Sequence, residues 1–399
     1  MPGEPAKWHP PTLPHTVERD SGFQYTDYNY ARQPRDPYSA MFHALSVMNP
    51  NYQFGDVDVL ADRNNLRVLL EFVQGKSNGP FRLDLYLLFN TLVIVRKESR
   101  WWKHSDGVSY GCNFEKFFTR PAVDMEDATS HYRAIKYSMG PLNVVCRFEA
   151  DAYDDGLVPD ELTEAKAKAV SGGLAERPIF DFRAPIRVLQ KGHIVPTAQM
   201  VELKTQKYDP ERFRPVACQD QLWFGRTSLC YTGPYELNTG VINRVKLEDA
   251  TDRIKNWEEA NQESLRKLVT LLTQLRAVLK RERRPNRAAV LVREGKGGPL
   301  SVRSMEGMSH AVGKDFFMKH WRRDVMQPGT QPGHYRGQRG GRGTFNPPRG
   351  RGLSYGNPAY QPNVGSSYQP NSGQAFTPRG RGFTRQRRSP DYGRGGPQI

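Results

Sequence analysis

Apolar and polar residues alternate along the first part of the chain in a way that predicts β-strands. Residues 81–89 alternate as a half-buried strand does, and residues 91–96 form a β-branched run typical of a buried strand. Residues 66–73 are apolar with an internal Arg and Glu, and they fit either a strand or a short helix. Further strands are expected at residues 143–153, 186–195 and 199–204.

The later part of the chain has mainly helical periodicity. Leucines within residues 246–284 recur at helical spacing, and shorter helices are expected from residue 114 and over residues 314–322. Residues 288–293 and 300–303 flank a glycine-rich turn, which predicts a hairpin. Strands and helices are mixed, so the expected fold class is α+β, with a central mixed sheet or sheets flanked by helices.

Composition divides the chain into three parts. Residues 1–37 are rich in proline, tyrosine and charge and predict an extended arm, while residues 38–327 carry the periodic pattern of a folded domain. Residues 328–399 contain 11 Arg, no Lys and a single acid, Asp391, and they supply most of the net charge of +16. Such a segment cannot bury enough apolar surface to offset its chain entropy, which predicts disorder.

The tail also has a pattern that indicates RNA binding. Arg-Gly dipeptides alternate with Tyr and Phe, and both arginine and aromatic side chains stack on unpaired bases. We therefore expect the tail to bind single-stranded RNA; the alternative is a linker that only solubilises the chain. The arginines of the dipeptides are Arg336, Arg339, Arg342, Arg349, Arg351, Arg379, Arg381 and Arg394.

Several classes of protein are not expected. The four cysteines lie far apart with no Cys-x-x-Cys pair, which argues against a zinc site or a disulfide framework. The first residues have no apolar core of a secretory signal, and no run approaches the ~18 apolar residues of a membrane span. We expect a protein of the nucleus or cytoplasm, with reduced thiols and no membrane contact.

Two short acidic segments lie in apolar surroundings. Glu149 and Asp151 follow an apolar run, and Glu202 and Lys204 lie within another. A buried charge is costly unless it is paired, and a divalent cation can hold three carboxylates together. A Lys two residues after a Glu lies on the same strand face and can reach a phosphate bound to that cation. The pattern predicts a metal-dependent phosphodiesterase site.

Four motifs in order resemble those of the DXO-type decapping exoribonuclease family, which includes fungal proteins. The motifs are Gly111-Cys-Asn-Phe-Glu115, Glu149-Ala-Asp151, Glu202-Leu-Lys204-Thr205 and Gln221 followed by an apolar run. The resemblance covers roughly residues 80–245 and implies a nuclease-like core with an Asp…Glu-x-Lys pattern. It also implies removal of incomplete or non-standard caps from RNA, degradation of RNA from the 5′ end, and a partner 5′–3′ exonuclease.

The resemblance further implies a site for two ions of Mg²⁺ or Mn²⁺. Glu115, Asp151, Glu202 and the backbone carbonyl of Leu203 would hold the first ion, and Glu149 with Asp151 would hold the second. Two such ions can activate a water molecule and stabilise the leaving oxygen of a phosphate ester.

Three further residues receive roles from the same resemblance. Lys204 and Gln221 would orient the nucleophile or bind the scissile phosphate, although Gln219 also fits the glutamine motif. Arg96, at the end of an apolar strand, is the expected upstream arginine that contacts RNA. Residues 154–198 make the spacing between the acidic motifs longer than in the family and are interpreted as an insertion.

Structural explanations of the same acidic residues remain open. Glu115 could be a helix-start acid, and Glu149 and Asp151 could pair with Arg147 or Arg133. The Glu-x-Lys motif could be an ion pair on an edge strand. Two other functions also fit: a non-catalytic RNA-binding protein with a degenerate nuclease-like scaffold, and a nuclease of the same core that acts on DNA.

Overall fold

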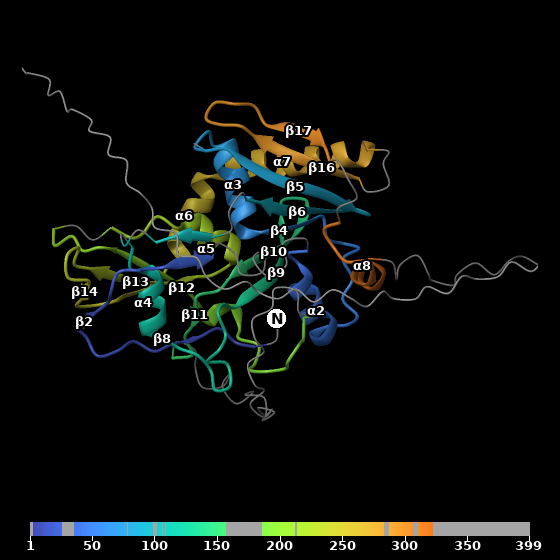
Figure 1. Ribbon diagram of the computed structural model, residues 1–399. Helices are drawn as coiled ribbons and strands as arrows, with labels where there is room; N and C mark the ends of the chain where they lie inside the picture. The colour runs from blue at the N-terminus through green and yellow to red at the C-terminus, as the bar shows by residue number, and fades with distance from the viewer. Residues whose placement is uncertain are drawn as a thin grey trace, which may run out of the picture. The chain divides into compact units, whose positions relative to one another are not determined.

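A computed structural model describes residues 3–25, 36–77, 79–98, 102–105, 107, 109–156, 186–211, 214–282, 287–305 and 310–321. Within this part the chain forms two mixed β-sheets with helices packed on their faces (Figure 1), so the expected α+β class is confirmed. The expectations for residues 328–399 and for most of the 154–198 insertion lie outside the described residues.

The first sheet has seven strands in the order β17-β16-β5-β6-β4-β10-β9. Strand β4 is parallel to both of its neighbours, β6 and β10, and the other pairs are antiparallel. The strands are β4 (Val59–Asp62), β5 (Phe81–Leu88), β6 (Thr91–Lys97), β9 (Tyr132–Met139), β10 (Leu142–Glu149), β16 (Ala288–Arg293) and β17 (Ser301–Ser304).

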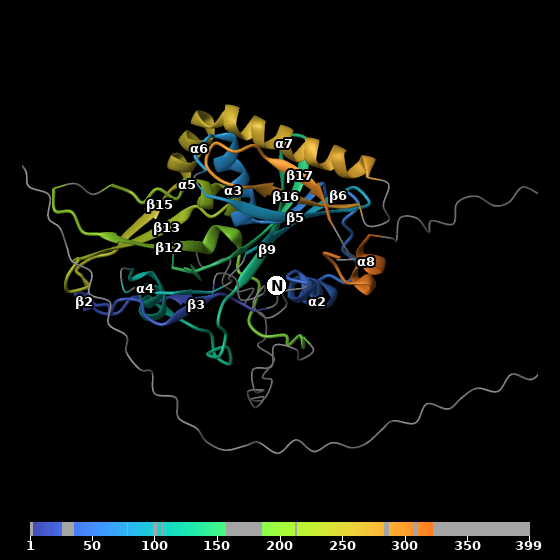
Figure 2. The same ribbon diagram turned by 45° about the horizontal axis from the view of Figure 1, so that its top comes forward.

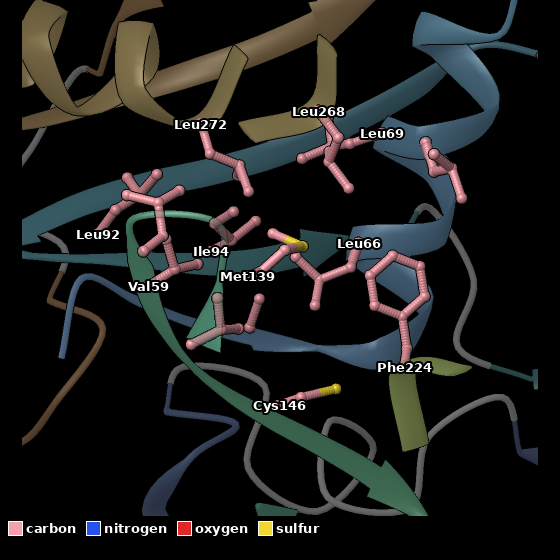
Figure 3. Close-up of a cluster of buried hydrophobic side chains, with 14 of the residues drawn as sticks. Val59, Leu66, Leu69, Leu92, Ile94, Met139, Cys146, Phe224, Leu268 and Leu272 are labelled. Atoms are coloured by element: carbon pink, nitrogen blue, oxygen red, sulfur yellow. The ribbon is translucent and has the colours of Figure 1, made fainter. Parts of the chain in front are cut away.

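Both faces of this sheet are buried, and its central strands supply apolar side chains to a cluster on each face. Helices α3 (Arg63–Val73) and α7 (Gln262–Arg281) cover one face, where Leu66 and Leu272 belong to one apolar cluster with Val59 (Figure 3). Helices α2 (Ser39–Met48) and α8 (Lys314–His320) lie side by side (Figure 2). They supply apolar side chains to the cluster on alternate strand positions such as Leu60 and Val93.

The second sheet has eight strands, ordered β2-β14-β13-β12-β11-β1-β8, with β15 paired to β13. Strands β3 (Phe23–Tyr25) and β7 (Trp102–His104) form a separate small sheet. The eight strands are β1 (Lys7–Trp8), β2 (His15–Thr16), β8 (Thr119–Arg120), β11 (Ala152–Tyr153), β12 (Met200–Lys207), β13 (Leu229–Tyr235), β14 (Val241–Ile242) and β15 (Lys246–Asp249).

Helices also pack on the second sheet. Helix α4 (Gly111–Phe118) buries Phe114 and Phe118 against Leu203 and Tyr231, which point to one face. Helices α5 (Gln219–Gly225) and α6 (Thr251–Ala260) contact each other, although β13, β14 and β15 separate them in sequence. A 3₁₀ turn at Thr197–Gln199 precedes β12. No helix in the described residues is both long enough and apolar enough to cross a membrane.

Residues 66–73, for which a strand or a short helix was expected, belong to a helix. Several other elements differ from the sequence-based expectation. Residues 186–195, expected as a strand, have no regular structure. The stretch 246–284 begins with strand β15, because Lys246–Asp249 pairs with β13 before the helices start. The segment 1–37, expected as an extended arm, contributes β1, β2 and β3, because its backbone groups pair with strands far away in sequence.

Candidate metal-dependent hydrolase site

The first acidic motif lies where the chain passes from one sheet to the other. Strand β10 ends at Glu149 in the seven-stranded sheet, and β11 begins at Ala152 in the eight-stranded sheet. Ala152 is opposite Val201 of β12 in an antiparallel pair, so extending the register by one residue places Asp151 beside Glu202. The two acidic motifs, 51 positions apart in sequence, therefore meet at the junction of the sheets.

Two cations hold the carboxylate of Glu202. Arg63, the first residue of α3, donates from Nη1 to Oε2 at 2.8 Å, and Lys204 donates from Nζ to Oε1 at 2.6 Å. The Glu202 side chain is only 3% exposed, so these contacts replace the water that an exposed carboxylate would have. The ion pair is thus buried, which contradicts the interpretation of the Glu-x-Lys motif as a solvent-facing pair on an edge strand.

The ammonium of Lys204 also marks the place where three oxygen atoms converge. Its Nζ donates to the backbone carbonyl of Leu203 at 3.0 Å and lies 3.8 Å from Oδ2 of Asp151, besides its contact with Glu202. The same Oδ2 accepts a hydrogen bond from the backbone N–H of Leu203 at 2.8 Å. These are three of the oxygen-bearing groups expected to hold the first metal ion.

Charge and burial shift the pKa values of the two central acids in opposite directions. Burial alone would raise the pKa of Glu202, but the charges of Arg63 and Lys204 outweigh it and hold that pKa at about 2. Burial, and next the charge of Glu202, raise the pKa of Asp151 to about 6. Burial would lower the pKa of Lys204, yet the two carboxylates raise it above its usual value. Glu202 is therefore the carboxylate that the two cations keep ionised.

Glu115 joins the same cluster from helix α4. Burial raises its pKa well above the usual value, and the next cause is the charge of Asp151; Glu149 and Glu202 add to the shift while Lys204 opposes it. These effects place the Glu115 carboxyl group near the other acids. Glu115 is in the middle of α4, between Asn113 and Phe117, so its identification as a simple helix-start acid does not account for its surroundings.

The donor set suits a hard divalent cation. Carboxylate and backbone carbonyl oxygens are the ligands that Mg²⁺ and Mn²⁺ prefer. The acids of this cluster also outnumber its two cationic side chains, Arg63 and Lys204. In the part of the chain that the structure describes, no three His, Cys, Asp or Glu side chains are arranged to hold a metal ion directly. Lys204 and Arg63 take both oxygens of Glu202.

Two of the expected site residues form no hydrogen bond or ion pair with the cluster. Gln221 is in the first turn of α5, and its side chain forms no hydrogen bond to another described residue. Arg96, near the end of β6, pairs with Glu98 at the surface. The cluster also contains Arg63, which sequence reasoning missed. The signal was an Asp-Arg pair at the end of the apolar run of β4.

The two arginines considered as structural partners of the first acidic motif have other bonds. Arg147 donates from Nε to Asp62 at 2.6 Å and lies over the ring of Tyr38. Arg133 donates to the backbone carbonyl of Val195 at 2.9 Å. Arg147 thus fixes the end of β4, which leads directly into Arg63.

Fold and site together define an α+β protein with a buried cluster of acids, a lysine and an arginine at the junction of two sheets. The chain belongs to the family described as a domain of unknown function, DUF8563, which matches residues 1–321. A search of curated proteins finds no match.

Solved structures with a similar fold include Rai1 proteins from yeasts. Rai1 of S. pombe is 14% identical, with a TM-score of 0.46 over 76% of this chain and 87% of that chain. Rai1 of Scheffersomyces stipitis, in complex with (3′-NADP)⁺ and calcium ion, is 12% identical, with a TM-score of 0.49 over 79% and 87%. Candida albicans Rai1, in complex with pU5 and Mn²⁺, is 12% identical, with a TM-score of 0.45 over 74% and 84%.

Proposed function

We propose that this chain is a divalent-metal-dependent hydrolase that acts on the 5′ ends of RNA. The supporting observation is the convergence of Asp151, Glu202 and Lys204 where the β10–β11 junction meets β12. Glu115 of α4 lies near enough for the charges of these residues to shift its pKa. The order and chemistry of these residues resemble the motifs of decapping exoribonucleases. The arginine-rich tail supports RNA as the substrate.

In this proposal Glu115, Asp151, Glu202 and the Leu203 carbonyl hold the Mg²⁺ or Mn²⁺ ion, and Glu149 with Asp151 would serve a second. A bound divalent ion supplies a more acidic water and neutralises charge on the phosphate. Lys204 would place its ammonium beside the scissile phosphate. Arg63 keeps Glu202 ionised and fixed in direction through its bond to Oε2.

A second candidate function is RNA binding without catalysis. The observation that favours it is that Arg63 and Lys204 already neutralise Glu202, so the cluster is satisfied as an ion-pair network. In this case the acids would stabilise the junction of the two sheets, and RNA would bind through the tail. The two functions differ in whether Mn²⁺ binds to the cluster, which can be measured directly.

The test incubates full-length protein with 5′-triphosphate, capped and 5′-monophosphate RNAs in Mg²⁺ or Mn²⁺. We expect release of the terminal group or of nucleotides by the wild type. The D151N variant should lower the rate at least about 100-fold, because it removes charge that the ion needs. The matched control is E263Q, which changes an exposed carboxylate of α7 paired with Lys267 and should leave the rate unchanged.

Equal rates for wild type and D151N would contradict the proposal. No activity on any RNA, together with no Mn²⁺ binding by calorimetry, would favour the non-catalytic candidate. Faster hydrolysis of DNA than of RNA by the wild type, lost in D151N, would keep the site and change the substrate. Circular dichroism of each variant shows whether the fold is kept, so that loss of activity is not confused with unfolding.

A further inference from the structure

Asp20 lies in the N-terminal segment between β2 and β3, and its side chain is buried. Its carboxylate accepts hydrogen bonds from the backbone N–H of Asn113 at 2.9 Å, from that of Cys112 at 3.3 Å, and from the hydroxyl of Ser109. Cys112 and Asn113 belong to the first turn of α4, whose own N-cap residue makes no side-chain capping bond. Asp20 therefore caps α4 from a distant part of the chain.

The backbone around Asp20 strengthens this attachment. Its N–H donates to the carbonyl of Ser109 at 2.8 Å, and its own carbonyl accepts from the Ser105 hydroxyl at 2.8 Å. The side-chain amide of Asn113 donates to the carbonyls of Glu18 and Arg19 at 3.1 and 3.2 Å. The start of α4 is thus bonded to residues 18–20 through several groups.

The N-terminal segment also holds the far end of α4. The ring of Trp8, in β1, lies 6.2 Å from that of Phe114 and 5.9 Å from that of Phe118, and 5.0 Å from that of Tyr231 beneath them. All four rings belong to the buried cluster on this face of the sheet. The helix is therefore fixed both along its axis, by Asp20, and about its axis, by the aromatic contacts.

Glu115 projects from the same short helix, two residues after Asn113. A rise of 1.5 Å per residue means that a small slip of α4 moves the Glu115 carboxyl group by a distance that matters to a metal ligand. We propose that Asp20 is a positioning residue, which holds α4 so that Glu115 faces Asp151. This inference rests on the proposed function, because Glu115 is there a metal ligand.

The test compares D20A with D249A, a control that removes the same kind of cap from another helix. Asp249 accepts from the N–H and hydroxyl of Thr251 at the start of α6, a helix that carries none of the proposed ligands. Amide hydrogen exchange of residues 112–118 is measured on metal-free protein, and Mn²⁺ binding by calorimetry. If D20A does not fold, D20N, which keeps the shape and one acceptor, takes its place.

We expect D20A to speed exchange in α4 and to weaken Mn²⁺ binding about 10-fold, the effect typical of residues that orient a ligand, and D249A to do neither. In an E115Q background D20A should cause no further loss of Mn²⁺ affinity, because the residue through which it acts is already changed. An equal additional loss in that background would show a general structural role and overturn the proposal.

Other outcomes would also overturn the proposal. Unchanged amide exchange in α4 of D20A overturns it, whatever the Mn²⁺ affinity of the variant. Faster exchange with Mn²⁺ affinity equal to that of the wild type reduces Asp20 to a structural cap and likewise overturns it. A wild type that binds no Mn²⁺ contradicts the proposed function first, and this result is distinct because it is seen without any variant.

Discussion

At the scale of single residues, the site depends on which acids pair with the side chains of Arg63 and Lys204. Arg63 and Lys204 both bond to Glu202, which keeps its pKa at about 2, while Asp151 next to it has a pKa of about 6. One acid is thus kept ionised by direct pairing, and the neighbouring acid is made more basic by burial and by the charge of Glu202. Of these two acids, Asp151 is the one whose pKa a bound divalent cation would lower most, because no cation among the described residues pairs with it as closely as with Glu202.

A half-buried acid, Asp36, predicts a pH dependence of stability away from the site. Burial raises its pKa to about 6, although bonds from the backbone of Gly313 and Tyr38 and the charge of Arg147 oppose the shift. Because the folded-state pKa lies above the unfolded value, the folded state binds this proton more tightly. The stabilising contribution is therefore complete below about pH 4 and is lost as the pH rises through 6.

The D36N variant removes this ionisation. Urea unfolding at pH 5, 6 and 7 should show the wild type losing stability relative to D36N as the pH rises. The control is D252N, which changes an exposed acid of α6 and should show no such trend. A difference between wild type and D36N that stays constant over this range would contradict the raised pKa of Asp36.

At the scale of elements, helix α4 fits against β13 only because that strand has a glycine at the contact. A Cβ atom on Gly233 would lie 2.5 Å from Cε2 of Phe114, whose ring is fully buried. The G233A variant must therefore push α4 away from the sheet. We expect it to lower the free energy of unfolding by about 1–3 kcal/mol, as overpacked cores do, measured by urea denaturation.

The matched substitution G295A places the same methyl group in open space and should change the stability by no more than about 0.5 kcal/mol. Because Glu115 follows Phe114 in α4, G233A should also weaken Mn²⁺ binding, whereas G295A should not. A G233A protein as stable as the wild type would mean that Phe114 can turn away without moving the helix.

At the scale of the whole molecule, charge is concentrated in residues 328–399, which carry 11 of the arginines. Removing these residues should reduce affinity for single-stranded RNA most strongly at low salt, because each neutralised phosphate releases counterions. The thermal midpoint of the remaining domain should not change. Gel-shift titrations at 50 and 200 mM salt measure the first effect, and calorimetry measures the second.

Replacing the 11 arginines by lysines keeps the charge but removes the planar stacking group. We expect this variant to keep the salt dependence and to bind RNA more weakly than the wild type. Equal affinity of the full-length and shortened proteins at low salt would exclude the tail from RNA binding and leave it as a solubilising segment.

The sequence alone determined much of the fold class and most of the acidic cluster. Strands such as β5, β6 and β12 have local patterns of apolar and β-branched residues, and side-chain alternation places Glu202 and Lys204 on one face. The order of the four motifs indicated Glu115 as a member of the same site. These features depend on residues close together in the chain, which a linear pattern can show.

Only the tertiary structure showed which partners complete the site. Arg63 reaches Glu202 across 139 positions, and Asp20 reaches Asn113 across 93, so neither contact has a local signature. The same holds for the N-terminal segment, whose short strands are formed by pairing with β8, β11 and β14 rather than by their own propensity. Local sequence patterns indicated which acids belong to the site. Long-range packing determined which groups pair with these acids and hold them in place.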